Sequence, residues 1–136
     1  MQKMVFSLLS ALVIACGSIE ISYANETSFA GITKAGVYTL KLPIKKLKSA
    51  PSWNPGNELP VSIVRAVRMS LDWAKSNYKP AEDVCISEIK LTQREKGFWY
   101  YYINFQKHPP LLILMDGSLV EPVICKRIEE CPKINK

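Results

Sequence analysis

The stretch GFWYYYINF, residues 97–105, consists mainly of aromatic side chains. Successive side chains of a β-strand point to opposite faces of the sheet, so a strand here would carry an aromatic row on each face. One row contains Trp99, Tyr101, Ile103 and Phe105, and the other contains Phe98, Tyr100 and Tyr102. We expect one row to pack on a helix. The other row covers a second small core or meets a partner.

The segments around this stretch also predict strands. Residues 84–95 alternate between apolar and polar side chains, and an apolar run at 111–115 follows the break at His108-Pro109-Pro110. Asp116-Gly117 lies between apolar runs, which is typical of a two-residue type I′ hairpin turn and would pair Leu114 with Leu119. Upstream, residues 37–43 alternate in the manner of a half-buried strand.

A helix is predicted between Pro60 and Pro80, because proline suits the first turn of a helix and stops one at its end. Between them, apolar residues recur at intervals of three or four positions. They are Val64, Val67, Leu71, Ala74 and Tyr78, with Ile63 beside them. This spacing predicts an amphipathic helix with a single apolar stripe.

The apolar faces of a helix and a sheet each need a partner, which favours a two-layer α+β domain. We therefore expect one amphipathic helix packed on a four- to five-stranded antiparallel sheet. The single domain is predicted at residues 37–127. A flexible lead at 25–36 precedes it, and a polar tail at 128–136 follows it.

The first 24 residues have the pattern of a signal peptide. Lys3 is followed by an apolar run, and Ser22 and Ala24 supply the small residues of a cleavage site. The segment VIACG, residues 13–17, offers an alternative, because it resembles a lipobox in which Cys16 receives a lipid. Both alternatives place the protein outside the cytosol, in the periplasm, either released or lipid-anchored through Cys16.

Three cysteines remain after either processing event, and an exported chain is expected to form disulfides. Cys125 and Cys131 would close a short loop, a pairing slightly favoured over Cys85 with either of them. The cysteine spacing does not match a zinc site, and His108 is the only histidine. We expect neither a metal nor a cofactor.

The chain of 136 residues has a formal net charge of +6, which favours weak attraction to anionic partners. Nucleic acid is a poor match for an exported protein. We expect an envelope or exported protein as the partner, with an anionic membrane surface as the alternative. Anionic lipid headgroups, acidic glycans and acidic proteins all fit the compartment.

The order helix, strand, strand and then MDGSLVEPV, residues 115–123, resembles the outline of PepSY-type and cystatin-like exported domains. The resemblance covers about half of the chain and rests on element order and one turn. It implies an inhibitor or accessory module rather than a catalyst. The basic N-terminal strand and the proline-rich loop that follows it depart from this outline.

The sequence contains none of the common catalytic motifs, which favours a protein that is not an enzyme. Two groups of residues are candidates for binding. On the outer face of the aromatic strand, Tyr100 and Tyr102 would stand near Glu88, Lys90 or Thr92 of the neighbouring strand, and Lys90 is the candidate among these three. A tyrosine offers rigid area and a polar tip at such a surface. In the basic segment KLPIKKLK, residues 41–48, the candidates are Lys45, Lys46 and Lys48, with Trp53 in the loop beyond.

We therefore expect a non-enzymatic exported protein that binds another macromolecule, as an inhibitor or accessory module. One alternative is a small thiol-dependent hydrolase in which His108 activates Cys85 or Cys125. Another is a structural lipoprotein of the envelope, anchored through Cys16.

Overall fold

The structure, a computed structural model, describes residues 19–22 and 25–131. Its strands form two antiparallel sheets of four strands each. The first sheet has the order β1 (Ile19–Ser22), β2 (Glu26–Thr33), β3 (Gly36–Pro43) and β8 (Val123–Cys125). The second sheet has the order β4 (Ile86–Glu95), β5 (Phe98–Phe105), β6 (His108–Leu114) and β7 (Leu119–Val120).

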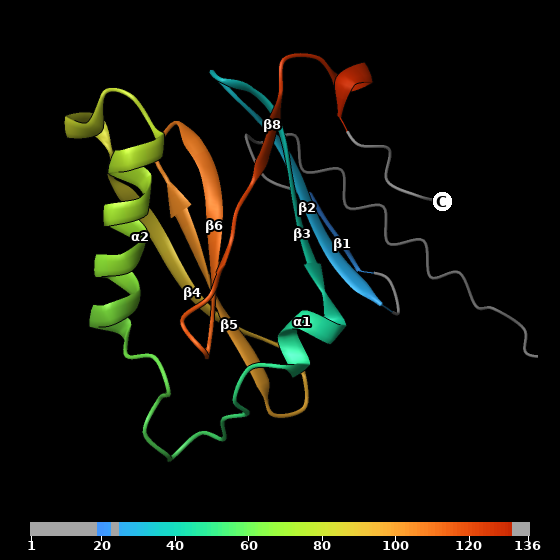
Figure 1. Ribbon diagram of the computed structural model, residues 1–136, viewed down its shortest axis with the longest axis vertical. Coiled ribbons are helices and arrows are strands. Elements are labelled where there is room, and N and C mark those ends of the chain that lie inside the picture. The colour runs from blue at the N-terminus through green and yellow to red at the C-terminus, as the bar shows by residue number, and fades with distance from the viewer. Residues whose placement is uncertain (1–18, 23–24, 132–136) are drawn as a thin grey trace, which may run out of the picture.

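The main helix, α2 (Ile63–Asn77), lies on one face of the second sheet, and the first sheet covers the opposite face (Figure 1). A short helix, α1 (Ile44–Lys48), follows β3 and contacts β5. Two single 3-10 turns, η1 (Ala81–Asp83) and η2 (Ile128–Glu130), complete the fold. The protein is α+β and its sheets are antiparallel, as expected. Helix α2 packs on a four-stranded sheet, but the prediction of a two-layer domain with a single sheet is wrong, because a second sheet adds a third layer (Figure 1).

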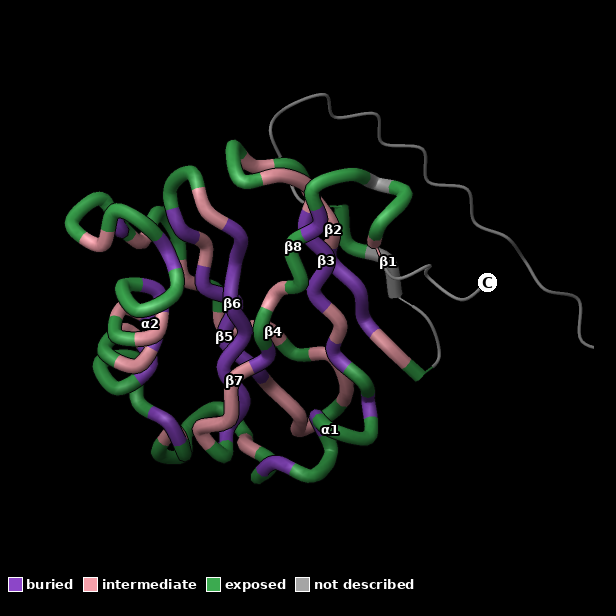
Figure 2. Tube along the Cα trace, turned by 45° about the horizontal axis from the view of Figure 1, so that its top comes forward, coloured by how far each residue is buried: buried purple, intermediate pink, exposed green. Residues whose placement is uncertain are grey.

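The aromatic strand β5 lies inside this arrangement and presents a different row of side chains to each neighbouring layer. On the helix side, the hydroxyl of Tyr101 donates a hydrogen bond of 2.7 Å to the carbonyl of Val61, just before α2. On the other side, the rings of Tyr100 and Tyr102 contact the ring of Phe29 from β2. The most buried part of the chain is therefore β5 and β6, between α2 and the first sheet (Figure 2).

Helix α2 begins after Ser62, whose hydroxyl accepts a hydrogen bond from the backbone N–H of Arg65, and it ends before Tyr78. The predicted helix is confirmed, but its buried side is displaced from the predicted stripe. Ala74 and Tyr78 of the stripe are buried, but Val64 is 68% exposed. Ala66 and Ser70 are buried in its place. Small side chains face the sheet because they allow the helix backbone to approach it closely.

The turn between β6 and β7 also differs from its prediction by one residue. Ile113 pairs with Leu119, and only Gly117 has a positive φ, of 83°. A type I′ turn needs positive φ at both central positions, so this hairpin uses a three-residue loop with glycine in the left-handed position. The Asp116 carboxylate stabilises the loop by accepting hydrogen bonds from the backbone N–H and the hydroxyl of Ser118.

Two segments predicted without regular structure have it. The expected flexible lead, 25–36, contains β2 and the turn into β3, and Thr27, Ser28 and Phe29 are buried there. The segment after Pro43, expected as a loop, begins with α1, which buries Ile44 and Leu47. Both segments are buried by contacts with distant parts of the chain. The local pattern of apolar and polar residues does not reveal such contacts.

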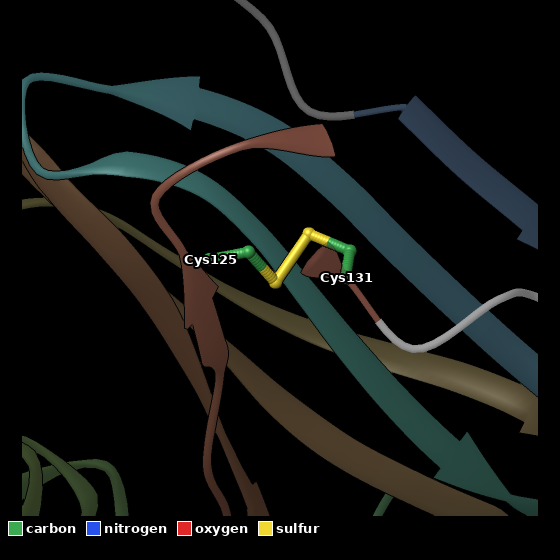
Figure 3. The surroundings of a disulfide bond; sticks show 2 residues. All are labelled: Cys125 and Cys131. Atoms are coloured by element: carbon green, nitrogen blue, oxygen red, sulfur yellow. A yellow bond between two sulfur atoms is a disulfide. The ribbon is translucent and has the colours of Figure 1, made fainter. Parts of the chain in front are cut away.

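A disulfide joins Cys125, at the end of β8, to Cys131, with their Cα atoms 5.3 Å apart (Figure 3). This confirms the favoured cysteine pairing. The bond ties the expected polar tail to the first sheet through η2. Cys85 is an exposed free thiol.

The predicted signal peptide, residues 1–24, and the lipidation candidate Cys16 fall largely outside the described residues. Only Ile19–Ser22 of that segment is described, and it forms β1, which pairs with β2. No helix in the described ranges 19–22 and 25–131 is long and apolar enough to cross a membrane.

Candidate binding cleft between the two sheets

A cleft of about 730 Å³ lies where the two sheets part, and we call it the intersheet cleft. From the first sheet it is lined by Gly31, Ile32, Thr33, Lys34 and Tyr38. From the second sheet it is lined by Glu88, Lys90, Tyr102, Asn104, Phe105, Lys107 and His108. The cleft therefore joins the β2–β3 hairpin to three strands of the second sheet.

The first-sheet wall depends on the contact between Gly31 and Tyr38, which face each other in the register of β2 and β3. A Cβ atom placed on Gly31 would lie 2.6 Å from the Tyr38 hydroxyl oxygen. Only glycine leaves room for this ring, because a contact that short is repulsive. The Tyr38 ring is buried against the strand, where it forms part of the cleft wall.

The second-sheet wall is held by Tyr78, which follows α2. Its ring stacks on His108, with ring centroids 4.5 Å apart and planes within 3°, and meets Phe105 edge to face at 5.9 Å. The Tyr78 hydroxyl donates a hydrogen bond of 3.0 Å to the carbonyl of Pro109. Burial, as the main cause, raises the pKa of Tyr78 well above its ordinary value. His108 is therefore held in place by its packing on Tyr78.

Lys107 lies at the tip of the turn between β5 and β6, with a φ of 63°. This left-handed conformation costs a residue other than glycine about 1 kcal/mol. The side chain is exposed at the cleft rim. A lysine therefore occupies a position where glycine would be more favourable for the backbone.

The lining of the cleft is positively charged on balance. Lys34, Lys90 and Lys107 contribute three cations, and Glu88 contributes one anion. The Nζ atom of Lys90 is 3.4 Å from Oε2 of Glu88, but both side chains are about half exposed, so this pair contributes little to stability. An anionic group entering the cleft would meet a positive potential, which a concave site between protein walls strengthens.

Tyr100 and Tyr102, the binding candidates on the second aromatic row, are buried. Tyr100 is 1% exposed and Tyr102 is 7% exposed, because β2 covers them with Phe29. The second aromatic row therefore covers a second small core, which is one of the two alternatives expected for it. The structure nevertheless places Tyr102 and the predicted Lys90 together, since both line the intersheet cleft.

A smaller pocket of about 160 Å³ adjoins the cleft and shares Lys90 and Tyr102 with it. Its other lining residues are Glu20 of β1, Phe29, Thr92 and Tyr100. Burial, as the main cause, raises the pKa of Tyr100, and the carboxylate of Glu20 raises it further. The carboxylate of Glu20 therefore lies close enough to the buried Tyr100 to affect the pKa of its hydroxyl.

The lysines of the basic segment and Trp53 lie outside the cleft. Lys48 forms an ion pair of 2.9 Å with Glu95, and Lys46 donates a hydrogen bond to the carbonyl of Leu119. Lys45 is exposed and lines a shallow hollow on α1 together with Lys48. Trp53 packs edge to face on Trp99 at 5.2 Å. These contacts fasten α1 and the following loop to the second sheet.

The cysteine and histidine considered for a thiol-dependent hydrolase do not both line the cleft. Cys125 is bonded to Cys131, so Cys85 is the remaining candidate nucleophile of the two considered for a thiol-dependent enzyme. His108 lines the cleft, whereas Cys85 does not. Within residues 19–22 and 25–131, no group of three or more histidine, cysteine, aspartate or glutamate side chains is placed to hold a metal ion.

Tyr38, Lys34 and Lys107 line the cleft although the sequence did not predict them as site residues. A signal for the first two exists in the segment ITKAGVY, residues 32–38, where Gly36 permits a hairpin turn with a φ of 126°. A hairpin there brings Tyr38 opposite Gly31 and places Lys34 at the turn. The segment resembles a flexible lead because few of its residues are strongly apolar.

The comparisons give no relatives from which to assign the site. No protein-family model matches the chain, and no curated protein or solved structure matches it significantly.

Proposed function

We propose that this protein is an exported, non-enzymatic binding protein that recognises an acidic segment of another protein in the intersheet cleft. One observation carries the proposal: three lysines and a buried tyrosine wall converge on one cleft from both sheets. A rigid aromatic wall with cations at its rim suits a protein surface, since tyrosine offers area at low entropic cost and charges select the partner.

The strained turn at Lys107 supports the proposal. Non-glycine residues with positive φ cluster at ligand sites, where the strain is retained because the side chain is needed. Asparagine or glycine would relieve the turn, but neither would contribute a cation to the rim. The lysine is therefore explained better by binding than by folding.

The disulfide supports the expected location outside the cytosol. Bonds of this kind persist in oxidising compartments and are rare in the cytosol. The Cys125–Cys131 bond fixes η2 to the end of β8. A chain that works in the periplasm, as an inhibitor or accessory module of an envelope protein, is consistent with this bond.

Affinity capture from a cell-envelope extract tests the proposed function, with charge reversal inside and outside the cleft. The cleft variant carries Lys90→Glu and Lys107→Glu. The control carries Arg68→Glu and Lys75→Glu, which change the net charge equally on exposed positions of α2. We expect the wild type and the control to retain one specific partner protein. The cleft variant should lose it by on the order of tenfold in affinity, about 1.4 kcal/mol.

Equal retention by both variants, or equal loss, would show that the cleft is not the binding site. Turnover of a hydrolase substrate that disappears in Cys85→Ser would contradict the non-enzymatic assignment. The Cys85→Ser variant is a fair test, because this thiol is exposed and its replacement leaves the core unchanged.

A further inference from the structure

The outer edge of β2 is covered over only half of its length. Strand β1 pairs with it in antiparallel register, with Ile19 opposite Ala30 and Ser22 opposite Thr27. Strand β2 continues to Thr33, so the last three residues of its outer edge have no partner in β1. A strand of only four residues therefore holds the edge of the first sheet.

The four residues of β1 belong to the segment expected to be removed on export. Cleavage after Ala24 would leave Asn25 as the first residue and would take β1 away. The mature first sheet would then begin at β2. Along the whole length of its outer edge, alternate residues of β2 would then present backbone N–H and C=O groups without strand partners, while the residues between them stay paired with β3.

The outer edge of the second sheet, β4, is protected in a way that β2 is not. Strand β4 contains two register irregularities, between Ile86 and Glu88 and between Gln93 and Glu95, and it carries charged side chains. Bulges and charges of this kind discourage the addition of another strand. From residue 27 to residue 33, β2 has no charge, no proline and no register irregularity against β3. Its edge therefore suits a further strand.

Glu20 of β1 indicates what chemistry the added strand needs. It pairs with Phe29 in the register, and it lines the small pocket beside Lys90 and Tyr100. This pocket shares Lys90 and Tyr102 with the intersheet cleft. Removal of β1 would take Glu20 out of this pocket, which adjoins the cleft.

We propose that the processed protein binds its partner by strand addition: an extended segment of the partner pairs with the edge of β2 and places an acidic side chain where Glu20 lies. Residues 19–22 hold this position until the leader is removed, so the precursor is closed to the partner. Main-chain hydrogen bonds would supply affinity, and the pockets for alternate side chains would supply specificity. This inference rests on the proposed function, because it names how the same cleft recognises its partner.

The test uses the protein purified from the periplasm together with the synthetic peptide SIEISYA, residues 18–24. Mass spectrometry of the mature N-terminus should give Asn25. Hydrogen exchange at residues 26–33 should be faster in the processed protein than in the uncleaved chain, and added peptide should slow it again. The peptide with Glu20→Lys should bind several-fold more weakly, because its cation would face Lys90. The peptide with Ile21→Pro should give no protection, because proline lacks the N–H that pairs strands.

A mature N-terminus at Cys16 would overturn the inference, because β1 would then be permanent. So would equal exchange at residues 26–33 in the processed and uncleaved chains, or equal binding of the native peptide and the peptide with Glu20→Lys. These results are distinguishable from a failure of the proposed function. If envelope capture still depends on Lys90 and Lys107 while the peptide has no effect, the cleft binds its partner without strand addition.

Discussion

The ring of Tyr102 on β5 lies 5.2 Å from the ring of Phe29 on β2, and this contact joins the two sheets. Phe29 also meets Tyr100 edge to face at 6.5 Å, so one side chain of the first sheet covers two aromatic residues of the second. The wall of the intersheet cleft begins beside this contact, since Tyr102 belongs to both. The position of the cleft therefore depends on how firmly the two sheets are held together.

Replacing Phe29 by alanine should lower the free energy of unfolding by about 3–5 kcal/mol, the usual cost of deleting a buried aromatic side chain. The matched control is Ile32→Ala on the same strand, where the side chain is 77% exposed. That change should alter the free energy by less than about 0.5 kcal/mol. Urea unfolding followed by tryptophan fluorescence measures both. Equal effects of the two substitutions would mean that the first sheet does not cover the second.

The buried side of α2 is tested by enlarging one of its small residues. Ala74→Leu should destabilise the protein by about 1–3 kcal/mol, because Ala74 is fully buried and a larger side chain would push the helix from the sheet. Val64→Ala should have little effect, since Val64 is 68% exposed. Thermal unfolding of both variants gives the comparison. A large loss of stability at Val64 would contradict this arrangement and would support the predicted stripe, to which both Val64 and Ala74 belong.

Stability should decrease at alkaline pH because of the buried tyrosines. Burial raises the pKa of Tyr78, Tyr100 and Tyr101 above the ordinary value of 10.0, which these groups regain on unfolding. As the pH rises, the unfolded chain therefore releases these protons at a lower pH than the folded protein does. Their contribution is fully present below pH 10.0 and is lost as the pH rises towards the folded values.

Urea midpoints measured against pH, together with the absorbance of tyrosinate, test this expectation. The midpoint should be insensitive to these groups below pH 10.0 and should fall above it, with tyrosinate appearing as the protein unfolds. Tyr100→Phe should reduce the alkaline slope by up to about 1.4 kcal/mol per pH unit. Titration of all the tyrosines near pH 10.0 without unfolding would contradict their burial.

Lys107→Gly should separate stability from binding. Glycine adopts the positive φ at this turn without strain, so the variant should be more stable by about 1 kcal/mol. It should also capture less of the partner, because one of the three cleft cations is lost. Lys107→Asn is the matched variant, because asparagine also tolerates the positive φ and keeps a polar side chain, but it carries no charge. Unchanged capture by both variants would remove Lys107 from the site.

Much of the second sheet was predictable because its pattern is local. The two aromatic rows follow from spacing along the chain, as does the helix between Pro60 and Pro80. The short loop between Cys125 and Cys131 favoured their pairing only slightly over the alternatives with Cys85. The neighbour of Tyr102 was predictable only as Glu88, Lys90 or Thr92, and the register of β5 and β4 selects Lys90.

The first sheet was not predictable in the same way. Strand β2 has the sequence ETSFAGIT, and its buried Thr27 and Ser28 give no apolar alternation. These side chains are buried by tertiary contacts, and the Thr27 hydroxyl accepts a hydrogen bond of 2.6 Å from Arg94 of the second sheet. The cleft was missed for the same reason, because a site between two sheets requires knowledge of both.

Site-specific photo-cross-linking in living cells tests most directly whether the intersheet cleft meets a protein partner. A photoreactive amino acid is placed at Asn104, which lines the cleft, and in a second chain at Lys75 on the exposed side of α2. We predict one discrete adduct with an envelope protein from position 104 and none from position 75. An adduct from position 75 alone, or none from position 104, would contradict the proposed function.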